Sequence, residues 1–368
     1  MTGIYISFPF CTQKCTYCHF ASGVFPSEWM PDYLEAVAAE IRAAAYPSTP
    51  DTVYLGGGTP SLIGVPELRR LLETLPVASW REATIEAAPG TISLEKAQAW
   101  AELGIQRVSL GVQSFVPRVA AAAGRKHTPE SIARDVEILR QAGIHDINID
   151  LLAGLAHQTE DTWRTSLDWT LRLDPSHVSV YMLDVDDESN LGRELQAGGT
   201  RFGAASVPTE DEITDFYLHA IRELADNSLP QYEISNFARP GRESQHNLKY
   251  WRMQPYIGFG VDAHSFDGAR RWGNVCSVEE YIGRSRRGDS VRAFTETLGE
   301  RRLAEDRFIT GLRQISGFDP ADGDKRLFEE PLRRMVDRGW LEQNSGRLAL
   351  TPEGLLFSNE VFAEFLSS

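Results

Sequence analysis

The chain has 368 residues, which corresponds to two or three domains of about 150 residues each. Its 42% hydrophobic and 24% charged residues exclude a wholly disordered chain. The 52 acidic residues outnumber the 37 basic ones, and the net charge of −15 argues against nucleic acid as a main partner. No apolar run approaches the roughly 20 residues of a transmembrane segment, and the first residues do not resemble a signal peptide. We therefore expect a cytoplasmic protein.

The first half of the chain alternates between strand-like and helix-like segments. Apolar and β-branched runs predict strands at residues 4–8, 52–55, 83–86, 107–112, 146–152 and 177–183. Amphipathic segments between them predict helices at residues 29–45, 65–75, 94–103, 130–142 and 161–173. This order predicts an α/β fold with a parallel sheet, a partial (β/α)6 barrel similar to a TIM barrel. In such folds, functional groups collect where the strands end.

The second half has a different texture. A helix is expected at residues 209–227, followed by a region rich in Pro, Gly and aromatic residues at 228–290. Helices are then expected at 300–312, 325–339 and 352–366, with a hairpin at 341–350 around Ser345-Gly346. This order predicts a winged-helix-like C-terminal domain that acts as a lid or packing unit, since no compact basic recognition helix is present. We divide the chain into a barrel (1–185), a barrel extension with an expected binding region (186–293) and the C-terminal domain (294–368).

Three of the four cysteines fall within one short segment. Cys11, Cys15 and Cys18 follow the first predicted strand, whereas Cys276 stands alone and is expected to be a buried thiol. Gaps of three and two residues let one loop supply three thiolates to an iron–sulfur cubane, which leaves one iron open to another ligand. Two alternatives are a zinc site completed by Cys276 or His19 and covalent haem attachment at the Cys-x-x-Cys-His that ends at His19.

The cysteine spacing after a first barrel strand resembles the radical S-adenosylmethionine (SAM) superfamily. This resemblance implies a [4Fe–4S] cluster whose open iron binds SAM and whose electron cleaves it to a 5′-deoxyadenosyl radical. Gly56-Gly57-Gly58-Thr59-Pro60 ends the second strand, and its glycines let backbone groups approach a ligand closely. Matches to family positions imply SAM contacts at Tyr5, Tyr17, Gly57, Gly58, Thr59, Glu86, Gln113, Arg125 and Asp150.

The whole chain resembles the oxygen-independent coproporphyrinogen III oxidase-like family, which has two branches. The oxidase branch carries a fourth cysteine where this chain has Phe20, and a long segment precedes its cluster loop, whereas here ten residues precede Cys11. The haem-chaperone branch, often called HemW, carries the His-Asn-x-x-Tyr-Trp motif. Here it reads His246-Asn247-Leu248-Lys249-Tyr250-Trp251.

This motif implies that haem, as cargo, contacts His246, Asn247, Tyr250 and Trp251, because histidine can be an axial ligand to haem iron. His264 is a second candidate for haem contact.

The expected function is a haem chaperone that binds a [4Fe–4S] cluster, SAM and haem. Its expected partners are a reductant and haem-accepting clients such as respiratory enzymes, with peripheral membrane contact as a further expectation. One alternative is the oxidative decarboxylation of coproporphyrinogen III to protoporphyrinogen IX, and another is a related radical SAM methyltransferase. Whether one or two SAM molecules bind stays open.

Overall fold

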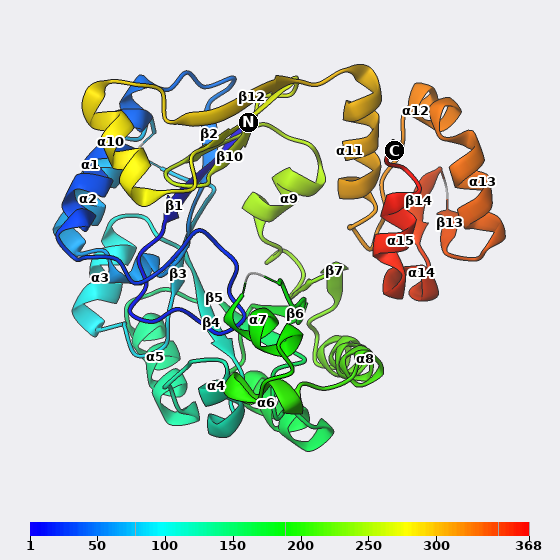
Figure 1. Cartoon of the computed structure of the whole chain (residues 1–368), viewed down its shortest axis with the longest axis horizontal. Helices are drawn as coiled ribbons and strands as arrows, with labels where there is room; N and C mark the ends of the chain where they lie inside the picture. The colour runs from blue at the N-terminus through cyan, green and yellow to red at the C-terminus, as the bar shows by residue number, and fades with distance from the viewer. Residues whose placement is uncertain (78, 188, 345, 368) are drawn as a thin grey trace.

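The computed structural model describes residues 1–77, 79–187, 189–344 and 346–367 (Figure 1). Six neighbouring parallel strands stand where they were predicted, and the expected α/β fold is confirmed. They are β1 (Thr2–Phe8), β2 (Pro50–Gly57), β3 (Glu82–Ala87), β4 (Arg107–Gln113), β5 (Asp146–Ala153) and β6 (His177–Met182). The helices between them are α1 (Trp29–Ala43), the short η1 (Pro60–Leu62), α2 (Val65–Glu73), α3 (Leu94–Glu102), α4 (Pro117–Ala122), α5 (Pro129–Gln141) and α6 (Glu160–Arg172).

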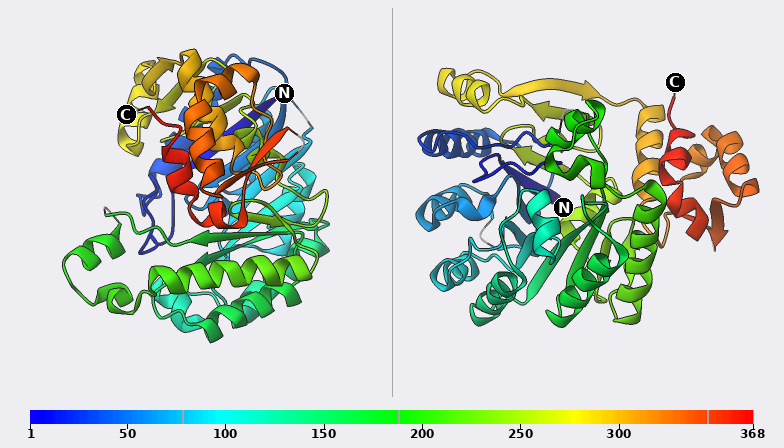
Figure 2. Two further views of the ribbon diagram at one scale, coloured as in Figure 1. Left: turned by 90° about the vertical axis from the view of Figure 1, so that its right-hand side faces the viewer. Right: turned by 60° about the horizontal axis from the view of Figure 1, so that its bottom comes forward.

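Alternation along each strand separates the packed outer face of the sheet from its inner face. Ile4, Ile6 and Val53 are fully or almost fully buried in the hydrophobic core, which the helices cover from outside (Figures 1 and 2). The neighbours Tyr5 and Tyr54 point to the opposite face and stay partly exposed. The core therefore lies between sheet and helices, and the inner face is free to carry polar side chains.

Six further strands extend the sheet at both edges. β7 (Gln231–Glu233) and β8 (Asn236–Ala238) continue from β6, and β9 (Tyr256–Phe259) lies parallel to β1. β10 (His264–Phe266), β11 (Arg270–Asn274) and β12 (Arg292–Thr297) follow as an antiparallel meander. The order β12-β11-β10-β9-β1-β2-β3-β4-β5-β6-β8-β7 is that of an open sheet, as expected for a partial barrel. Among the described residues, the region predicted only as a barrel extension thus supplies five whole strands of this sheet and the start of β12.

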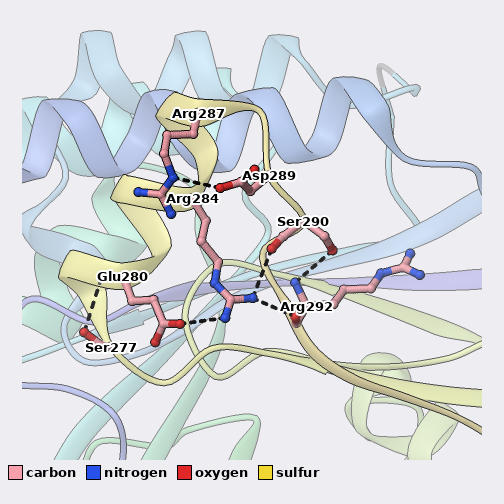
Figure 3. A network of polar contacts seen from close by, with 7 residues as sticks. All are labelled: Ser277, Glu280, Arg284, Arg287, Asp289, Ser290 and Arg292. Carbon is pink, nitrogen blue, oxygen red and sulfur yellow. Dashed lines mark hydrogen bonds and ion pairs between the residues drawn. The ribbon is translucent and has the colours of Figure 1, made fainter.

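A polar network holds the start of β12 against α10 (Val278–Arg287), as Figure 3 shows. The guanidinium of Arg284 donates to Glu280 on the same helix and to the backbone carbonyls of Ser290 and Arg292. The Ser277 hydroxyl accepts from the backbone N–H of Glu280 and caps the helix. Although β12 is an edge strand, its first residues are therefore tied to a packed helix.

The C-terminal unit stands beside the sheet (Figure 1). It contains α11 (Glu300–Gly311), α12 (Asp322–Leu327), α13 (Glu329–Asp337), β13 (Leu341–Asn344), β14 (Arg347–Leu350), α14 (Pro352–Leu356) and α15 (Ser358–Ala363). The predicted hairpin is present, although Ser345 of its turn lies outside the described residues. The second and third predicted helices are each divided in two. The expected boundary at residue 294 falls inside β12, so this unit begins with α11.

The remaining helices connect these parts. They are α7 (Asn190–Gln196), the 3-10 helix η2 (Arg201–Ser206), α8 (Glu210–Asp226) and α9 (Gln245–Trp251). α8 confirms the helix predicted at residues 209–227. In the described parts of the chain, no helix combines the length and apolar character needed to cross a membrane.

Candidate active site at the carboxyl edge of the barrel

The cluster loop, residues 11–18, leaves the carboxyl end of β1 and is tied to two neighbouring segments. The carbonyl of Phe10 accepts the backbone N–H of Thr59 at 3.0 Å. The Thr16 hydroxyl donates to the carbonyl of Ala122 at the end of α4, at 3.1 Å. The loop is thus positioned between the end of β2 and α4, and all three of its cysteines are partly exposed.

The three thiols are the donors that an iron–sulfur cluster requires. Burial raises the pKa of Cys11 and of Cys15, while a hydrogen bond with Thr59 and the charge of Arg125, respectively, act in the opposite direction. Among the described residues, no three His, Cys, Asp or Glu side chains converge as they would around a single metal ion. The donor set therefore fits a cluster wrapped by one loop better than a preformed zinc site.

The glycine turn after β2 approaches the start of the cluster loop closely. Gly57 has φ +106°, which side chains rarely tolerate, and a Cβ at Gly58 would lie 2.8 Å from the carbonyl oxygen of Phe8. The backbone N–H of Gly57 donates to the Glu86 carboxylate at 3.1 Å. The turn therefore joins the cluster loop to a carboxylate at the end of β3, and Thr59 completes it.

Two carboxylates face the inner side of the barrel from β3 and β5. Glu86 accepts a hydrogen bond from the Tyr54 hydroxyl at 2.9 Å, and burial, followed by the nearby Asp150 charge, raises the pKa of Glu86 to about 7. Asp150 accepts from the Asn148 amide at 2.7 Å and from the Ser109 hydroxyl at 3.1 Å, and burial raises its pKa. Such carboxylates can accept hydrogen bonds from ribose hydroxyls or an ammonium group.

Gln113 and Arg125 show two signs of a ligand site. Gln113 has φ 67° at a register shift between β4 and β5, a conformation that costs on the order of 1–3 kcal/mol and is typical of functional sites. Its amide and the Arg125 guanidinium meet above Gly111, where a Cβ would lie 3.3 Å from the first and 3.6 Å from the second. The Arg125 Nε is buried without a hydrogen-bond partner among the described residues. An unpaired buried guanidinium N–H fits an anionic ligand such as the SAM carboxylate.

The two predicted tyrosines lie at opposite sides of this edge. Tyr17 on the cluster loop lies beside Arg125; burial raises the Tyr17 pKa, and the guanidinium charge opposes this shift. Tyr5 on the inner face of β1 stacks on Tyr54, with ring centroids 6.1 Å apart. The positions predicted for SAM thus lie on the inner face and at the carboxyl ends of β1 to β5, on the cluster loop and just after α4.

His246 lies elsewhere, at the amino ends of the strands. Its Nδ1 lies 2.9 Å from the Thr52 hydroxyl at the start of β2, and its Nε2 lies 2.8 Å from the Tyr250 hydroxyl. The side chain is buried, and burial, together with the charge of Lys249, lowers its pKa to about 3, so the ring is neutral. Both ring nitrogens have hydrogen-bond partners within the chain, so ligation of haem iron by His246 requires one of these bonds to break.

The rest of the His-Asn-x-x-Tyr-Trp motif joins α9 to its surroundings. The Asn247 backbone N–H donates to the capping hydroxyl of Ser244. Tyr250 packs edge-on against Tyr256, with centroids 4.6 Å apart, and the Trp251 ring lies 4.3 Å below the Arg313 guanidinium. These are packing contacts of a helix wedged between the sheet and α11, and the motif's haem role stays a prediction.

Three further residues differ from or add to the expectations. Cys276 is exposed, so the expected buried thiol is wrong. His19 and His264 are also exposed, and His264 stands on β10. A polar layer beneath the site, which includes Ser109 and Asn148, was not predicted from the sequence. The period-2 alternation of polar residues along β4 and β5 is the signal that could have found it.

Comparison with known proteins identifies the family of the chain. Residues 5–170 match the radical SAM superfamily. The haem chaperone HemW of Bacillus subtilis is 32% identical over 100% of this chain and 99% of its own, and HemW of Escherichia coli is 30% identical over 99% and 98%. The structure of the E. coli coproporphyrinogen III oxidase HemN matches with a TM-score of 0.85 at 21% identity, over 99% of this chain and 89% of that chain. With its cysteine loop and glycine turn in the expected places, the chain belongs to the HemW family of the radical SAM superfamily.

Proposed function

We propose that the chain is a haem chaperone that binds a [4Fe–4S] cluster and SAM and carries haem to client proteins. The observation that carries this proposal is the full-length similarity to proteins named haem chaperones, 32% for the B. subtilis protein. The likeness to the E. coli coproporphyrinogen III oxidase concerns the fold alone, and one fold can serve different chemistries.

The residues at the carboxyl edge have separate tasks in this proposal. Cys11, Cys15 and Cys18 would hold the cluster, which together with SAM supplies one-electron chemistry when reduced. Arg125 would pair with the SAM carboxylate through its buried, unpaired Nε–H. Glu86 and Asp150 would accept from the ribose or the ammonium group, and Tyr5, Tyr17, Gln113 and the turn Gly57-Gly58-Thr59 would complete the pocket. The protein would act in the cytoplasm with a reductant and haem-accepting clients.

An anaerobic haem titration of cluster-reconstituted protein tests this function. The Soret band should shift saturably at about one haem per chain, and the loaded protein should pass its haem to apomyoglobin. Absence of saturable binding would contradict the proposal. In that case, conversion of coproporphyrinogen III to protoporphyrinogen IX with release of 5′-deoxyadenosine would instead establish the enzyme.

A further inference from the structure

His264 is free to bind a ligand, unlike the buried histidines His246 and His177. It is exposed, and among the described residues neither of its ring nitrogens has a hydrogen-bond partner. His246 and His177, by contrast, each use both ring nitrogens in hydrogen bonds. Because haem iron needs an imidazole lone pair that nothing else occupies, His264 meets a condition that His246 does not.

The position of His264 places it on the same face of the sheet as the SAM pocket. Phe266 pairs with Tyr256 across β10 and β9, and alternation puts His264 on the face of Phe266 and Tyr256. Tyr5 pairs with Gly258 and shares this inner face, since Gly258 is two residues from Tyr256. His264 thus stands two strands from Tyr5, about 10 Å across the sheet.

A glycine, Gly273, and an aromatic ring, Phe294, lie beside the His264 imidazole. His264 pairs with Gly273 on β11, which in turn pairs with Phe294 on β12. A Cβ at Gly273 would overlap both the His264 ring and the Phe294 ring, so both side chains lean over this glycine. Phe294 is 43% exposed, and its ring centroid lies 5.7 Å from that of His264. A flat macrocycle at this place would contact a free imidazole and an apolar ring, and Gly273 would contribute no side chain that blocks it.

The polar network at α10 holds the start of β12, the strand that carries Phe294. Arg284 binds the carbonyl of Arg292, two residues before Phe294, at 3.0 Å (Figure 3). On the same inner face, Arg271 forms an ion pair with Asp306 of α11 at 2.5 Å, which joins β11 to the C-terminal unit. The start of β12, which carries the phenyl ring, and β11, which lies between β10 and β12, are therefore each held by a neighbouring helix.

We propose that His264 is the axial ligand to the haem iron and that the macrocycle packs on Phe294 on the inner face of β10 to β12. This assignment rests on the proposed function and names its cargo site. Coordination consists of donation of one imidazole lone pair to iron, without electron transfer or a leaving group. The haem would lie in the same open barrel as SAM. A structural change in the SAM pocket would then act on the bound haem directly.

The test is an anaerobic ferric haem titration of the full, cluster-reconstituted chain with four variants. His264→Ala should lose the histidine-ligated Soret spectrum and weaken binding by about tenfold or more, while SAM binding stays unchanged. Phe294→Ala should weaken binding less and keep the ligation spectrum. His145→Ala, at another exposed histidine, should match wild type. His246→Ala should keep the spectrum in whatever fraction of the chain folds.

A second experiment separates ligation from folding. Free imidazole added to His264→Gly should restore the low-spin spectrum, which a merely structural role of His264 would not produce. Unchanged haem ligation in His264→Ala, or its loss in His246→Ala alone, would overturn the assignment while leaving the chaperone function in place. Absence of saturable haem binding by the wild-type chain would reject both.

Discussion

The two ends of the barrel hold the side chains predicted for ligand binding in different states. At the carboxyl edge, Arg125 has a buried N–H without a partner, Gln113 has a strained backbone and the Glu86 pKa is raised to about 7. At the amino edge, the His246 ring is bound on both sides, and Lys249 forms an ion pair with Asp51 at 2.6 Å. The Arg125 N–H is thus available to a ligand, whereas the His246 ring and the Lys249 ammonium group are used in contacts within the protein. Buried polar atoms without a hydrogen-bond partner also occur at the amino edge, among them the Arg107 Nε and the Trp251 Nε1, so the contrast concerns these particular side chains.

The difference matters because both ends carry motifs that look functional in the sequence. The backbone N–H groups of Gln245 and His246 donate to the Glu82 carboxylate at 2.8 and 2.9 Å, which fastens the start of α9 to β3. In this arrangement α9 connects the sheet to the C-terminal unit. Substitutions at the carboxyl edge should therefore reduce ligand binding, and substitutions in α9 should reduce stability.

The largest effect is expected from removing the cluster ligands. The Cys11→Ala/Cys15→Ala/Cys18→Ala protein should bind no iron and no sulfide after anaerobic reconstitution, because a single cysteine, Cys276, is left and a cluster needs several thiolates. Iron and sulfide per chain are the measurement. Cys276→Ala, at the fourth and exposed cysteine, is the matched control and should retain the full cluster. Iron and sulfide retained by the triple variant would overturn the cluster assignment.

The next prediction tests whether α9 contributes to stability and not to ligand binding. Lys249→Met leaves the Asp51 carboxylate without its cation at a site where Lys249 is almost fully buried, and breaking such a pair costs about 3–5 kcal/mol. The free energy of unfolding should fall by this amount in urea, while cluster content per folded chain stays constant. The control Arg164→Met breaks an exposed ion pair with Glu160 and should cost less than about 1 kcal/mol. Equal losses in both variants would contradict the structural role of α9.

The contrast also explains what could be predicted from the sequence. The six parallel strands and the cysteine loop follow from local periodicity and from short spacing along the chain, so they were predicted correctly. The surroundings of His246 could not be predicted in this way, because Thr52 lies 194 residues away and Glu82 lies 164 residues away. The motif residues were visible, but whether they were free or already paired depended on these distant contacts.

The strands beyond β6 were missed for a similar reason. β7, β8 and β10 have three residues each, too few for alternation to be recognised in a region rich in Pro and Gly. Their register depends on pairing with β6 and β9 rather than on their own composition. His264 could therefore be singled out in the sequence, but not placed on the inner face.

A moderate effect is expected at the SAM pocket itself. A hydrogen bond to a charged group contributes about 1.5–3 kcal/mol, so Arg125→Met should weaken SAM binding roughly 10- to 150-fold. Anaerobic calorimetry on reconstituted protein measures this, after iron content has been checked because Arg125 lies near Cys15. Arg172→Met, on the exposed side of α6, serves as the control and should leave affinity unchanged. If Arg125→Met also bound SAM as wild type does, its unpaired Nε would have no ligand role.

The smallest effect concerns the pH dependence of stability through Glu86. The pKa of its carboxyl has the usual value of 4.5 in the unfolded chain and is raised to about 7 in the folded chain. Between these values the folded state binds a proton that the unfolded state lacks, so the contribution of Glu86 to stability falls as pH rises from about 4.5 to about 7. Glu86→Gln cannot ionise. Without SAM, its stability relative to wild type should therefore increase over this window by on the order of 1–3 kcal/mol.

A second variant tests the physical cause of this shift. The Tyr54 hydroxyl donates to Glu86 and favours the ionised form, so Tyr54→Phe should raise the Glu86 pKa further and extend the window above pH 7. Urea unfolding midpoints should be measured from pH 4.5 to pH 8 for wild type, both single variants and the double variant. The comparison separates the contribution of Glu86 to the pH dependence of stability from the contributions of the other buried carboxyls. A difference between wild type and Glu86→Gln that stays flat with pH would mean that this carboxylate is as well solvated in the folded chain as in the unfolded one. The carboxyl edge would then lack one of the features that distinguish Glu86 from the paired His246 at the amino edge.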